Sequence, residues 1–353
     1  MLCSYHTPFP YRRQAAMPEK AKREAKTAKR DLTRRVPPVY NRDKGAFEHM
    51  QYVIGADGGG TKTALRAYVP HGTGLRPVSD RIVCEGINYN FGSVETAAAR
   101  LVEGVRRCSV PDGTLIAVGL GDPACDDQVE NDQTRQFRQA LEAALQVRVL
   151  TRSDVYMSLY GLTAGRPGVM VVSGTGSMGL GQDAAGQIHA VGGWGRITGD
   201  EGSGYWIARE GLRAAMRAAD GLEPPTALLD AALEWAGVRE PRALIGYLYP
   251  PDGEREIAAF AARAAACAQA DGRALGILRE AGILLAGYAR RLLTLCGGNT
   301  VGIYGSVLVR NAPVRAAFEG TLRAAFPDAD VRVPDKTPEE AAAAYAWAGI
   351  KEV

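Results

Sequence analysis

Short apolar runs separated by glycine-rich loops dominate the chain after residue 50. Residues 52–56 are an apolar run, residues 58–60 are glycines, and apolar and polar positions alternate over residues 65–69. A period of two is typical of a β-strand, so this block predicts a strand, a glycine loop and a second strand. Residues 168–172 and the Ser/Thr/Gly loop after them repeat this design, and a turn at residues 183–186 predicts one more strand. Two such blocks predict two related halves.

The rest of the pattern alternates between buried strands and helices. Apolar runs predict further strands at residues 81–85, 114–120, 148–151, 300–304 and 331–333. Apolar spacing or helix-forming composition predicts helices at residues 93–108, 132–145, 206–219, 226–236, 255–271, 274–295 and 313–325. A last helix follows Thr337-Pro-Glu-Glu340, where a proline occupies the first turn and two acids lie near the positive end. The fold class is therefore predicted to be α/β.

The first 49 residues differ from the rest in composition. They hold 12 of the 42 Lys and Arg residues and 5 of the 39 Asp and Glu residues, which leaves 30 basic and 34 acidic residues for the remainder. With little apolar content to bury, residues 1–49 are predicted to be a basic, disordered extension. One interpretation is an arm that touches nucleic acid or anionic lipid. Another is that translation starts at Met50, so that residues 1–49 are not native.

The composition of the 353-residue chain excludes several classes of protein. With 46% hydrophobic and 23% charged residues it is neither collagen, nor a coiled coil, nor wholly disordered. The acidic balance after residue 49 argues against a nucleic-acid binder. Six cysteines form no C-x-x-C pair, so we expect no zinc ribbon and reduced cysteines in a cytoplasmic protein. No apolar stretch predicts a signal peptide or a membrane span.

The first glycine loop, Asp57-Gly-Gly-Gly-Thr-Lys-Thr63, lies between two predicted strands. Its glycines let backbone N–H groups approach an anion, and Thr61 and Thr63 add hydroxyl donors. An acid at the end of a strand suits a phosphate-bound Mg²⁺. The loop is not a Walker A motif, because an alternating strand follows it instead of a helix. An ordinary glycine hairpin is the alternative interpretation.

The second glycine loop, Ser173-Gly-Thr-Gly-Ser177, begins a formal G-x-G-x-x-G pattern. A dinucleotide-binding fingerprint requires a helix after the glycines, whereas a strand and a turn follow here. We therefore reject a Rossmann site. The hydroxyl and N–H donors of this loop could still bind phosphate oxygens opposite the first loop.

Residues 192–207 contain six glycines and the acid pair Asp200-Glu201 next to aromatic residues. Carboxylates beside an aromatic ring recognise sugars through hydroxyl hydrogen bonds and ring stacking. The alternative is a buried tryptophan under a helix N-terminus, with Asp200 or Ser203 serving only as a cap.

Taken together, these motifs resemble the N-acetylglucosamine kinase branch of the BadF/BadG/BcrA/BcrD ATPase family, in the sugar kinase, Hsp70 and actin superfamily. The motifs that carry the resemblance are residues 57–63, 173–177, 192–195 and 199–207, in the family's order. The resemblance implies two ribonuclease-H-like (actin-like ATPase) domains around a central cleft that closes on MgATP and a sugar. It implies a first domain of residues 50–165 plus 335–353 and a larger, helix-rich domain of residues 166–334.

The resemblance also implies roles for individual residues. Asp154 resembles the general base that accepts the proton of the sugar hydroxyl, and Asp57 is expected near the metal. The residues expected to contact ATP are Gly59, Gly60, Thr61, Lys62, Thr175, Gly176, Ser177, Ala268 and Ser306. The residues expected to bind the sugar are Asn88, Asp154, Gly193, Trp194, Gly195 and Asp200. A plain helix N-cap is the alternative role for Asp154.

The chain departs from the family's pattern at two places. The usual Asn-Asp-Ala at the base is Ser153-Asp154-Val155, and the usual small-residue loop after the fourth strand reads Gly121-Asp-Pro-Ala124. The second departure lies where the N-acyl group of a sugar would sit. It therefore bears on the choice of amino sugar more than on the reaction.

The resemblance implies phosphorylation of N-acetylglucosamine to N-acetylglucosamine 6-phosphate, with ATP and Mg²⁺ as cofactors and no nucleic-acid or membrane partner. One alternative is an activator ATPase of the 2-hydroxyacyl-CoA dehydratase or benzoyl-CoA reductase type, whose iron–sulfur cluster needs cysteines that do not stand beside the second glycine loop. Another is a non-catalytic sugar-sensing homologue, which would lack the base or the phosphate loops. A homodimer is an open option, because homodimers are the commonest soluble assembly.

Overall fold

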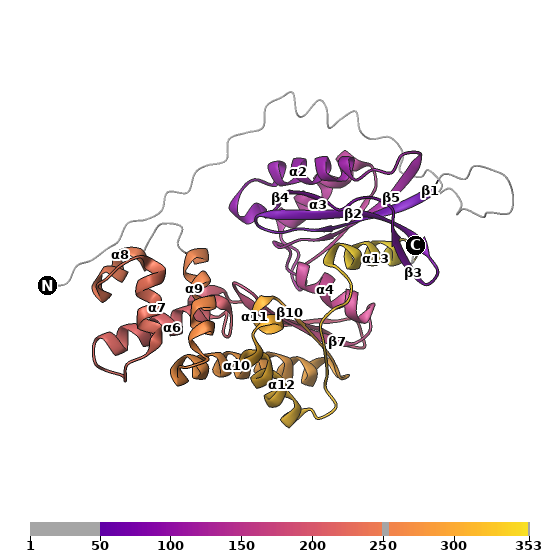
Figure 1. Cartoon of the computed structure of the whole chain (residues 1–353). Coiled ribbons are helices and arrows are strands. Elements are labelled where there is room, and N and C mark those ends of the chain that lie inside the picture. The colour runs from indigo at the N-terminus through magenta and orange to yellow at the C-terminus, as the bar shows by residue number, and fades with distance from the viewer. Residues whose placement is uncertain (1–49, 249–253, 352–353) are drawn as a thin grey trace. The chain divides into compact units, whose positions relative to one another are not determined.

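The computed structural model describes residues 50–248 and 254–351, which contain two β-sheets (Figure 1). The predicted disordered extension and the proposed start at Met50 concern residues 1–49, which lie outside the described residues. The first sheet consists of β1 (Met50–Asp57), β2 (Lys62–His71), β3 (Gly74–Pro77), β4 (Ile82–Glu85), β5 (Gly113–Gly121) and β6 (Arg148–Arg152). Strands β5 and β6 run parallel to β1, whereas β2 is antiparallel to it.

The second sheet repeats the order of the first. It consists of β7 (Gly168–Ser173), β8 (Ser177–Gln182), β9 (Ile188–Gly192), β10 (Thr300–Tyr304) and β11 (Asp330–Arg332). In each sheet, the first strand begins an antiparallel meander on one side and pairs with a parallel strand on the other. The shared topology confirms the prediction of two related halves, and each glycine loop is the first hairpin turn of its sheet.

Most helices were predictable from the sequence pattern. The α-helices are α2 (Val94–Arg107), α3 (Asp132–Leu145), α4 (Asp154–Thr163), α5 (Gly195–Thr198), α6 (Gly204–Ala219), α7 (Ala227–Ala236), α8 (Leu244–Leu248), α9 (Glu254–Cys267), α10 (Gly272–Cys296), α11 (Ser306–Arg310), α12 (Ala312–Ala325) and α13 (Pro338–Lys351). Two short 3-10 helices are η1 (Tyr89–Phe91) and η2 (Pro241–Ala243). The helix predicted at residues 255–271 ends early, at Cys267, because the Asp271 carboxylate caps α10 by accepting from the N–H groups of Arg273 and Ala274.

Helices cover both faces of the first sheet. Apolar side chains of α2 and α3 pack with those of β1, β2 and β5 in one core. On the opposite face, α13 packs Ala343 and Ala346 against Val53 and Ala117. This helix lies very close to the strands: an added Cβ at Gly119 would stand 1.9 Å from the carbonyl oxygen of Ala342. Glycine is therefore required there to let helix and sheet approach.

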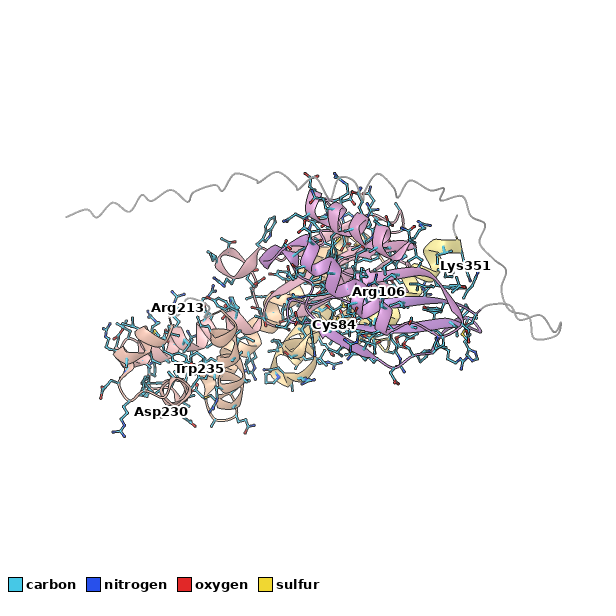
Figure 2. All side chains as sticks on the ribbon, turned by 90° about the horizontal axis from the view of Figure 1, so that it is seen from above. Cys84, Arg106, Arg213, Asp230, Trp235 and Lys351 are labelled. Carbon is cyan, nitrogen blue, oxygen red and sulfur yellow. The ribbon has the colours of Figure 1, made fainter. Side chains whose placement is uncertain are left out.

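The second sheet carries the larger core. Side chains of α6, α7, α9, α10 and α12 pack with those of β7 and β10 in this core. Figure 2 labels Trp235, which packs against this core. The centroid of its ring lies 4.7 Å from that of Tyr247 and 5.3 Å from that of Phe260. Abundant helices around this sheet agree with the predicted helix-rich half.

The opposite face of the second sheet packs against α4, whose Val155 and Leu159 contact Met170 and Leu180. Helices α4 and α13 also contact each other, as Figure 1 shows between the two sheets. The ring centroids of Tyr156 and Tyr345 lie 5.7 Å apart in an edge-on arrangement. Because α4 contacts β5 of the first sheet as well as β7, β8 and β10 of the second, the domain boundaries near residues 165 and 335 stay a prediction.

Candidate functional site

A cavity of about 250 Å³ lies where β1 ends and α4 begins. Parallel pairing places Asp57 opposite Gly121, and Gly121 opposite Arg152, so the carboxyl ends of three neighbouring strands meet at one edge of the sheet. The cavity is lined by Asp57, Gly58, Gly59, Thr61, Lys62, Ala64, Arg81, Asp154, Val155, Ser158, Val172, Tyr304 and Pro338. The first glycine loop and the predicted base therefore share one cavity.

The first glycine loop is a close-packed hairpin. The N–H of Gly58 donates to the carbonyl of Gly121 over 2.8 Å, and an added Cβ at Gly59 would stand 2.7 Å from the carbonyl oxygen of Lys62. Of the two threonines expected to add donors, Thr61 lines the cavity, whereas Thr63 is fully buried with no hydrogen-bond partner for its hydroxyl among the described residues. The expectation for Thr63 was wrong, because strand alternation turns it away from the loop.

Asp57 stands in an unfavourable place for a negative charge. The pKa of its carboxyl is raised to about 7, mainly by burial and also by the nearby charges of Asp154 and Glu339, against the opposite effect of Arg81 and Lys62. Across the described ranges, no cluster of three or more His, Cys, Asp or Glu side chains could hold a metal by itself. One buried carboxylate whose charge the neighbouring basic side chains only partly offset fits Mg²⁺, which often takes one or two protein ligands and completes its shell with phosphate oxygens and water.

We expect the change Asp57→Asn to stabilise the ligand-free protein at pH 8 and to have a clearly smaller effect at pH 5. The folded state keeps a proton on Asp57 up to a pKa of about 7, whereas the unfolded state loses it near the ordinary carboxyl pKa of 3.8. Stability therefore falls as the pH rises between about 4 and 7, and asparagine removes this loss. Urea unfolding at both pH values measures the effect, and Asp328→Asn at an exposed position is the matched control. An equal gain at pH 5 and pH 8 would contradict the assignment.

Asp154 is the first residue of α4, and it is not the helix cap. The N-cap is Ser153, whose hydroxyl accepts from the N–H of Tyr156 over 2.9 Å. The alternative that Asp154 serves only as a cap is therefore wrong. Its carboxylate accepts from the N–H of Val155 over 2.8 Å, and burial raises its pKa, with a further contribution from the charge of Asp127. A carboxylate with a raised pKa is a stronger base, as proton abstraction near neutral pH requires.

Asp127 fixes the start of this helix. Its carboxylate accepts from both the N–H and the hydroxyl of Ser153. The serine that replaces the family's usual asparagine before the base is thus held by a neighbouring acid. Asp122 lies in the other segment that departs from the family's pattern, residues 121–124, and it is buried. Its carboxylate accepts from the Tyr89 hydroxyl over 2.7 Å and from the N–H of Ala124 over 2.9 Å.

A second cavity, of about 600 Å³, lies at the second glycine loop. It is lined by Gly174, Thr175, Gly204, Ile207, Ala258, Ala259, Ala261, Ala262, Ala265, Ser306, Val307, Arg310, Asn311, Ala312 and Pro313. Thr175 and Ser306 lie there as expected for a nucleotide site. Ala268 does not line this cavity, because α9 ends before it; Ala265, one turn earlier, does.

The second glycine loop is fixed by the Gly-Asp-Glu-Gly-Ser-Gly segment. The N–H of Gly204 donates to the carbonyl of Gly174 over 2.7 Å, and the Ser173 hydroxyl donates to the carbonyl of Gly202 over 2.9 Å. The carboxylate of Asp200 accepts from the N–H of Ser177 at 3.4 Å. It also lies against Gly176, where an added Cβ would stand 3.0 Å from Oδ2. Asp200 thus connects residues 199–204 to the second glycine loop, the candidate phosphate-binding loop.

The predicted sugar-binding turn is exposed. Gly193 and Gly195 have φ values of +74° and +77°, which favour glycine, and the Trp194 side chain between them is 79% exposed. The alternative of a buried tryptophan under a helix N-terminus holds for Trp206, which is 7% exposed in the first turn of α6, where the cap Ser203 accepts from its N–H. It does not hold for Trp194. The Asn88 carboxamide accepts from the N–H of Asn90 over 3.0 Å.

Several predicted residues lie outside both cavity linings. They are Gly60, Asn88, Gly176, Ser177, Gly193, Trp194, Gly195, Asp200 and Ala268. The turn is nonetheless tied to the second loop, because the N–H of Gly193 donates to the carbonyl of Ser177 over 3.2 Å. The roles of these residues stay predictions.

Sequence reasoning missed several residues that line the cavities. They are Arg81, Ser158, Tyr304, Arg310 and Asn311. Tyr304 directly precedes Gly305-Ser306 at the end of a predicted strand, so its position was a usable signal. Burial raises its pKa, and the charges of Asp57, Glu339 and Asp154 raise it further, which places the phenol near the acids. Arg81 belongs to no motif.

The repeated sheet topology with a glycine hairpin in each half defines an actin-like ATPase fold made of two ribonuclease-H-like domains. A solved structure from Chromobacterium violaceum, which carries the provisional name N-acetylglucosamine kinase, has this fold; it matches with a TM-score of 0.65 and 24% identity, over 84% of this chain and 98% of that one. The chain belongs to the BadF/BadG/BcrA/BcrD ATPase family, whose model matches residues 54–343.

Two curated relatives are similar over part of their length. The N-acetylmuramic acid/N-acetylglucosamine kinase of Clostridium acetobutylicum is 29% identical over 212 residues, which are 57% of this chain and 65% of the relative. The N-acetyl-D-glucosamine kinase of Dictyostelium discoideum is 30% identical over 210 residues, which are 56% of this chain and 64% of the relative. The chain thus matches just under two thirds of the length of these relatives.

Two further observations concern the expected absence of membrane and disulfide features. Within residues 50–248 and 254–351, no helix has the length and apolar content needed to cross a membrane. The cysteines at positions 84, 108, 125, 267 and 296 are free.

Proposed function

We propose that this protein transfers the terminal phosphate of ATP to an amino sugar, converting N-acetylglucosamine to N-acetylglucosamine 6-phosphate. The observation that carries the proposal is the shared cavity of Asp154, Asp57 and the first glycine loop. The family membership supports the use of ATP, and the names of the two curated relatives support an amino sugar as acceptor.

In the proposed reaction, the carboxylate of Asp154 accepts the proton of the sugar O6 hydroxyl, and the oxygen then attacks the terminal phosphorus. The bond between that phosphorus and the bridging oxygen breaks, and ADP leaves. Phosphoryl transfer needs positioning and charge neutralisation more than covalent chemistry. The N–H groups of both glycine loops, with Thr61 and Thr175, would hold the phosphates. Asp57 would hold Mg²⁺, which when bound neutralises phosphate charge. The mainly apolar wall of the second cavity suits the nucleoside.

Exclusion of water is the remaining requirement for phosphate transfer to a sugar. We propose that the two halves close on their substrates, with the exposed Trp194 stacking on the sugar ring and Asn88, Gly193, Gly195 and Asp200 supplying polar contacts. Buried polar groups that lose a partner discriminate strongly between substrates. Asp122 lies in the loop that departs from the family's pattern, and burial together with the nearby charge of Asp154 raises its pKa. This loop is therefore our candidate for a contribution to the choice of sugar.

A substrate panel tests the proposal. A coupled ADP-release assay with N-acetylglucosamine, glucosamine, N-acetylmuramic acid, glucose and N-acetylmannosamine should give the highest kcat/KM for N-acetylglucosamine. The activator-ATPase alternative predicts ATP hydrolysis without any sugar and an iron-containing, coloured protein. The sugar-sensing alternative predicts binding of a sugar in calorimetry without ADP release. Inactivity on every amino sugar would refute the proposal.

A further inference from the structure

Arg81 lines the cavity of Asp57 and Asp154, although it belongs to none of the sequence motifs. It directly precedes β4, and its side chain is 46% exposed while it lines the cavity. Its positive charge acts on the cavity, because it lowers the pKa of Asp57 against the stronger effect of burial. A guanidinium that faces a cavity lined by a glycine loop is placed to meet an anion.

A buried acid from the other end of the chain holds this arginine. Nε of Arg81 donates to Oε1 of Glu339 over 2.6 Å, and Glu339, in the first turn of α13, is 1% exposed. Oε2 of Glu339 is buried and has no hydrogen-bond partner in the described part of the chain. Arg81 is therefore the side chain that compensates this buried charge. Burial of a carboxylate costs free energy of folding. That cost argues that Glu339 serves the site by orienting the guanidinium of Arg81.

The geometry leaves the terminal nitrogens of Arg81 for another partner. Among the hydrogen bonds of residues 50–248 and 254–351, Arg81 uses only Nε. Its planar fork matches two oxygens of a phosphate, and such charge-assisted bonds are stronger than neutral ones. Lys62 is the other basic side chain of this lining, from the glycine loop itself.

We propose that Arg81 contacts the terminal phosphate of the nucleotide and that Glu339 is its positioning residue. The inference rests on the proposed function and deepens it, because it names the side chain that offsets charge on the transferred phosphate. The contact adds no covalent step: the guanidinium stays protonated and donates hydrogen bonds to phosphate oxygens in the ground state and in the transition state.

Calorimetric titration with MgATP and MgADP tests the inference without turnover. We expect Arg81→Ala to weaken MgATP binding by about tenfold or more, as loss of a charge-assisted hydrogen bond does, and to change MgADP binding less than about threefold. Arg81→Lys should recover only part of the MgATP affinity, because an ammonium lacks the fork. Arg135→Ala removes a matched surface ion pair on α3 and should leave both affinities unchanged.

Arg81→Ala alone leaves the buried carboxylate of Glu339 without its partner, which by itself would destabilise the fold. The double variant Arg81→Ala/Glu339→Gln removes that charge as well and therefore separates loss of binding from loss of folding. Urea unfolding should show it near wild-type stability, and it should bind MgADP normally but MgATP weakly. Glu339→Gln alone should lower kcat and the preference for ATP over ADP less than Arg81→Ala does. Equal loss of both affinities, or loss of neither, would overturn the role of Arg81. A wild-type protein that phosphorylates no sugar, yet loses its preference for ATP on Arg81→Ala, would refute the proposed function and leave this contact standing.

Discussion

Asp154→Asn should lower kcat for sugar phosphorylation by at least about 10²–10⁴-fold, the contribution typical of a general base. The amide cannot accept the hydroxyl proton, although it can keep the hydrogen bond from the N–H of Val155. Because burial already disfavours the charge at this position, the variant should fold at least as stably as the wild type. The Ser153 cap of α4 is untouched.

The assay for this variant is ADP release at saturating sugar and MgATP, with MgATP affinity measured separately by calorimetry. Asp132→Asn, an exposed acid at the start of α3, is the matched control, because it makes the same chemical change in the first turn of another helix. Near-normal turnover by Asp154→Asn would refute its role as base. Loss of MgATP binding in parallel with kcat would point instead to a role in placing the nucleotide.

Gly119→Ala should destabilise the protein by about 3 kcal/mol or more, at the upper end of the range for overpacked sites. The new Cβ would stand 1.9 Å from the carbonyl oxygen of Ala342 and 2.5 Å from its carbon. Both atoms belong to the backbone of α13, so no side-chain rotation relieves the clash. The helix must move away from β5, which opens the core that includes Ala117 and Ala346.

Urea unfolding of Gly119→Ala beside Gly276→Ala measures this effect. Gly276 lies within α10, and an added Cβ there meets nothing within 4 Å. The control should therefore be neutral or more stable by about 0.5–1 kcal/mol, the helix propensity of alanine over glycine. Equal unfolding midpoints for the two variants would show that α13 does not dock on the first sheet as closely as the structure has it.

The features that depend on local sequence were predictable. Both glycine hairpins and the helix after Thr337 follow from residue types that act within a few positions of themselves. The strand β3 was missed because it has only four residues. The helix α4 was missed because most of its side chains are buried, so it lacks the polar face that gives a helical period. The predicted helix end at residue 271 failed for a specific reason: Asp271 was counted as a helical residue, whereas its side chain caps the next helix.

The features that depend on distant contacts were not predictable from the residues. Arg81 and Glu339 stand 258 positions apart, and nothing near either residue indicates the other. Likewise, the exposure of Trp194 depends on which way a turn of left-handed glycines projects, and the sequence left a buried ring open as an alternative. The family resemblance indicated Asp154 as the candidate base, but only the structure shows that Ser153, and not Asp154, caps α4.

The contact between α4 and α13 has a mechanical consequence. Asp154 begins one of these helices and Glu339 lies in the first turn of the other. The helices touch closely at Gly161, where an added Cβ would stand 2.8 Å from that of Ala341, and through the rings of Tyr156 and Tyr345. Any shear of one helix along the other would displace the carboxylate of Asp154, the proposed base, relative to the Arg81 guanidinium that Glu339 holds. The packing of α4 against α13 therefore sets the distance between the carboxylate of Asp154 and the guanidinium of Arg81.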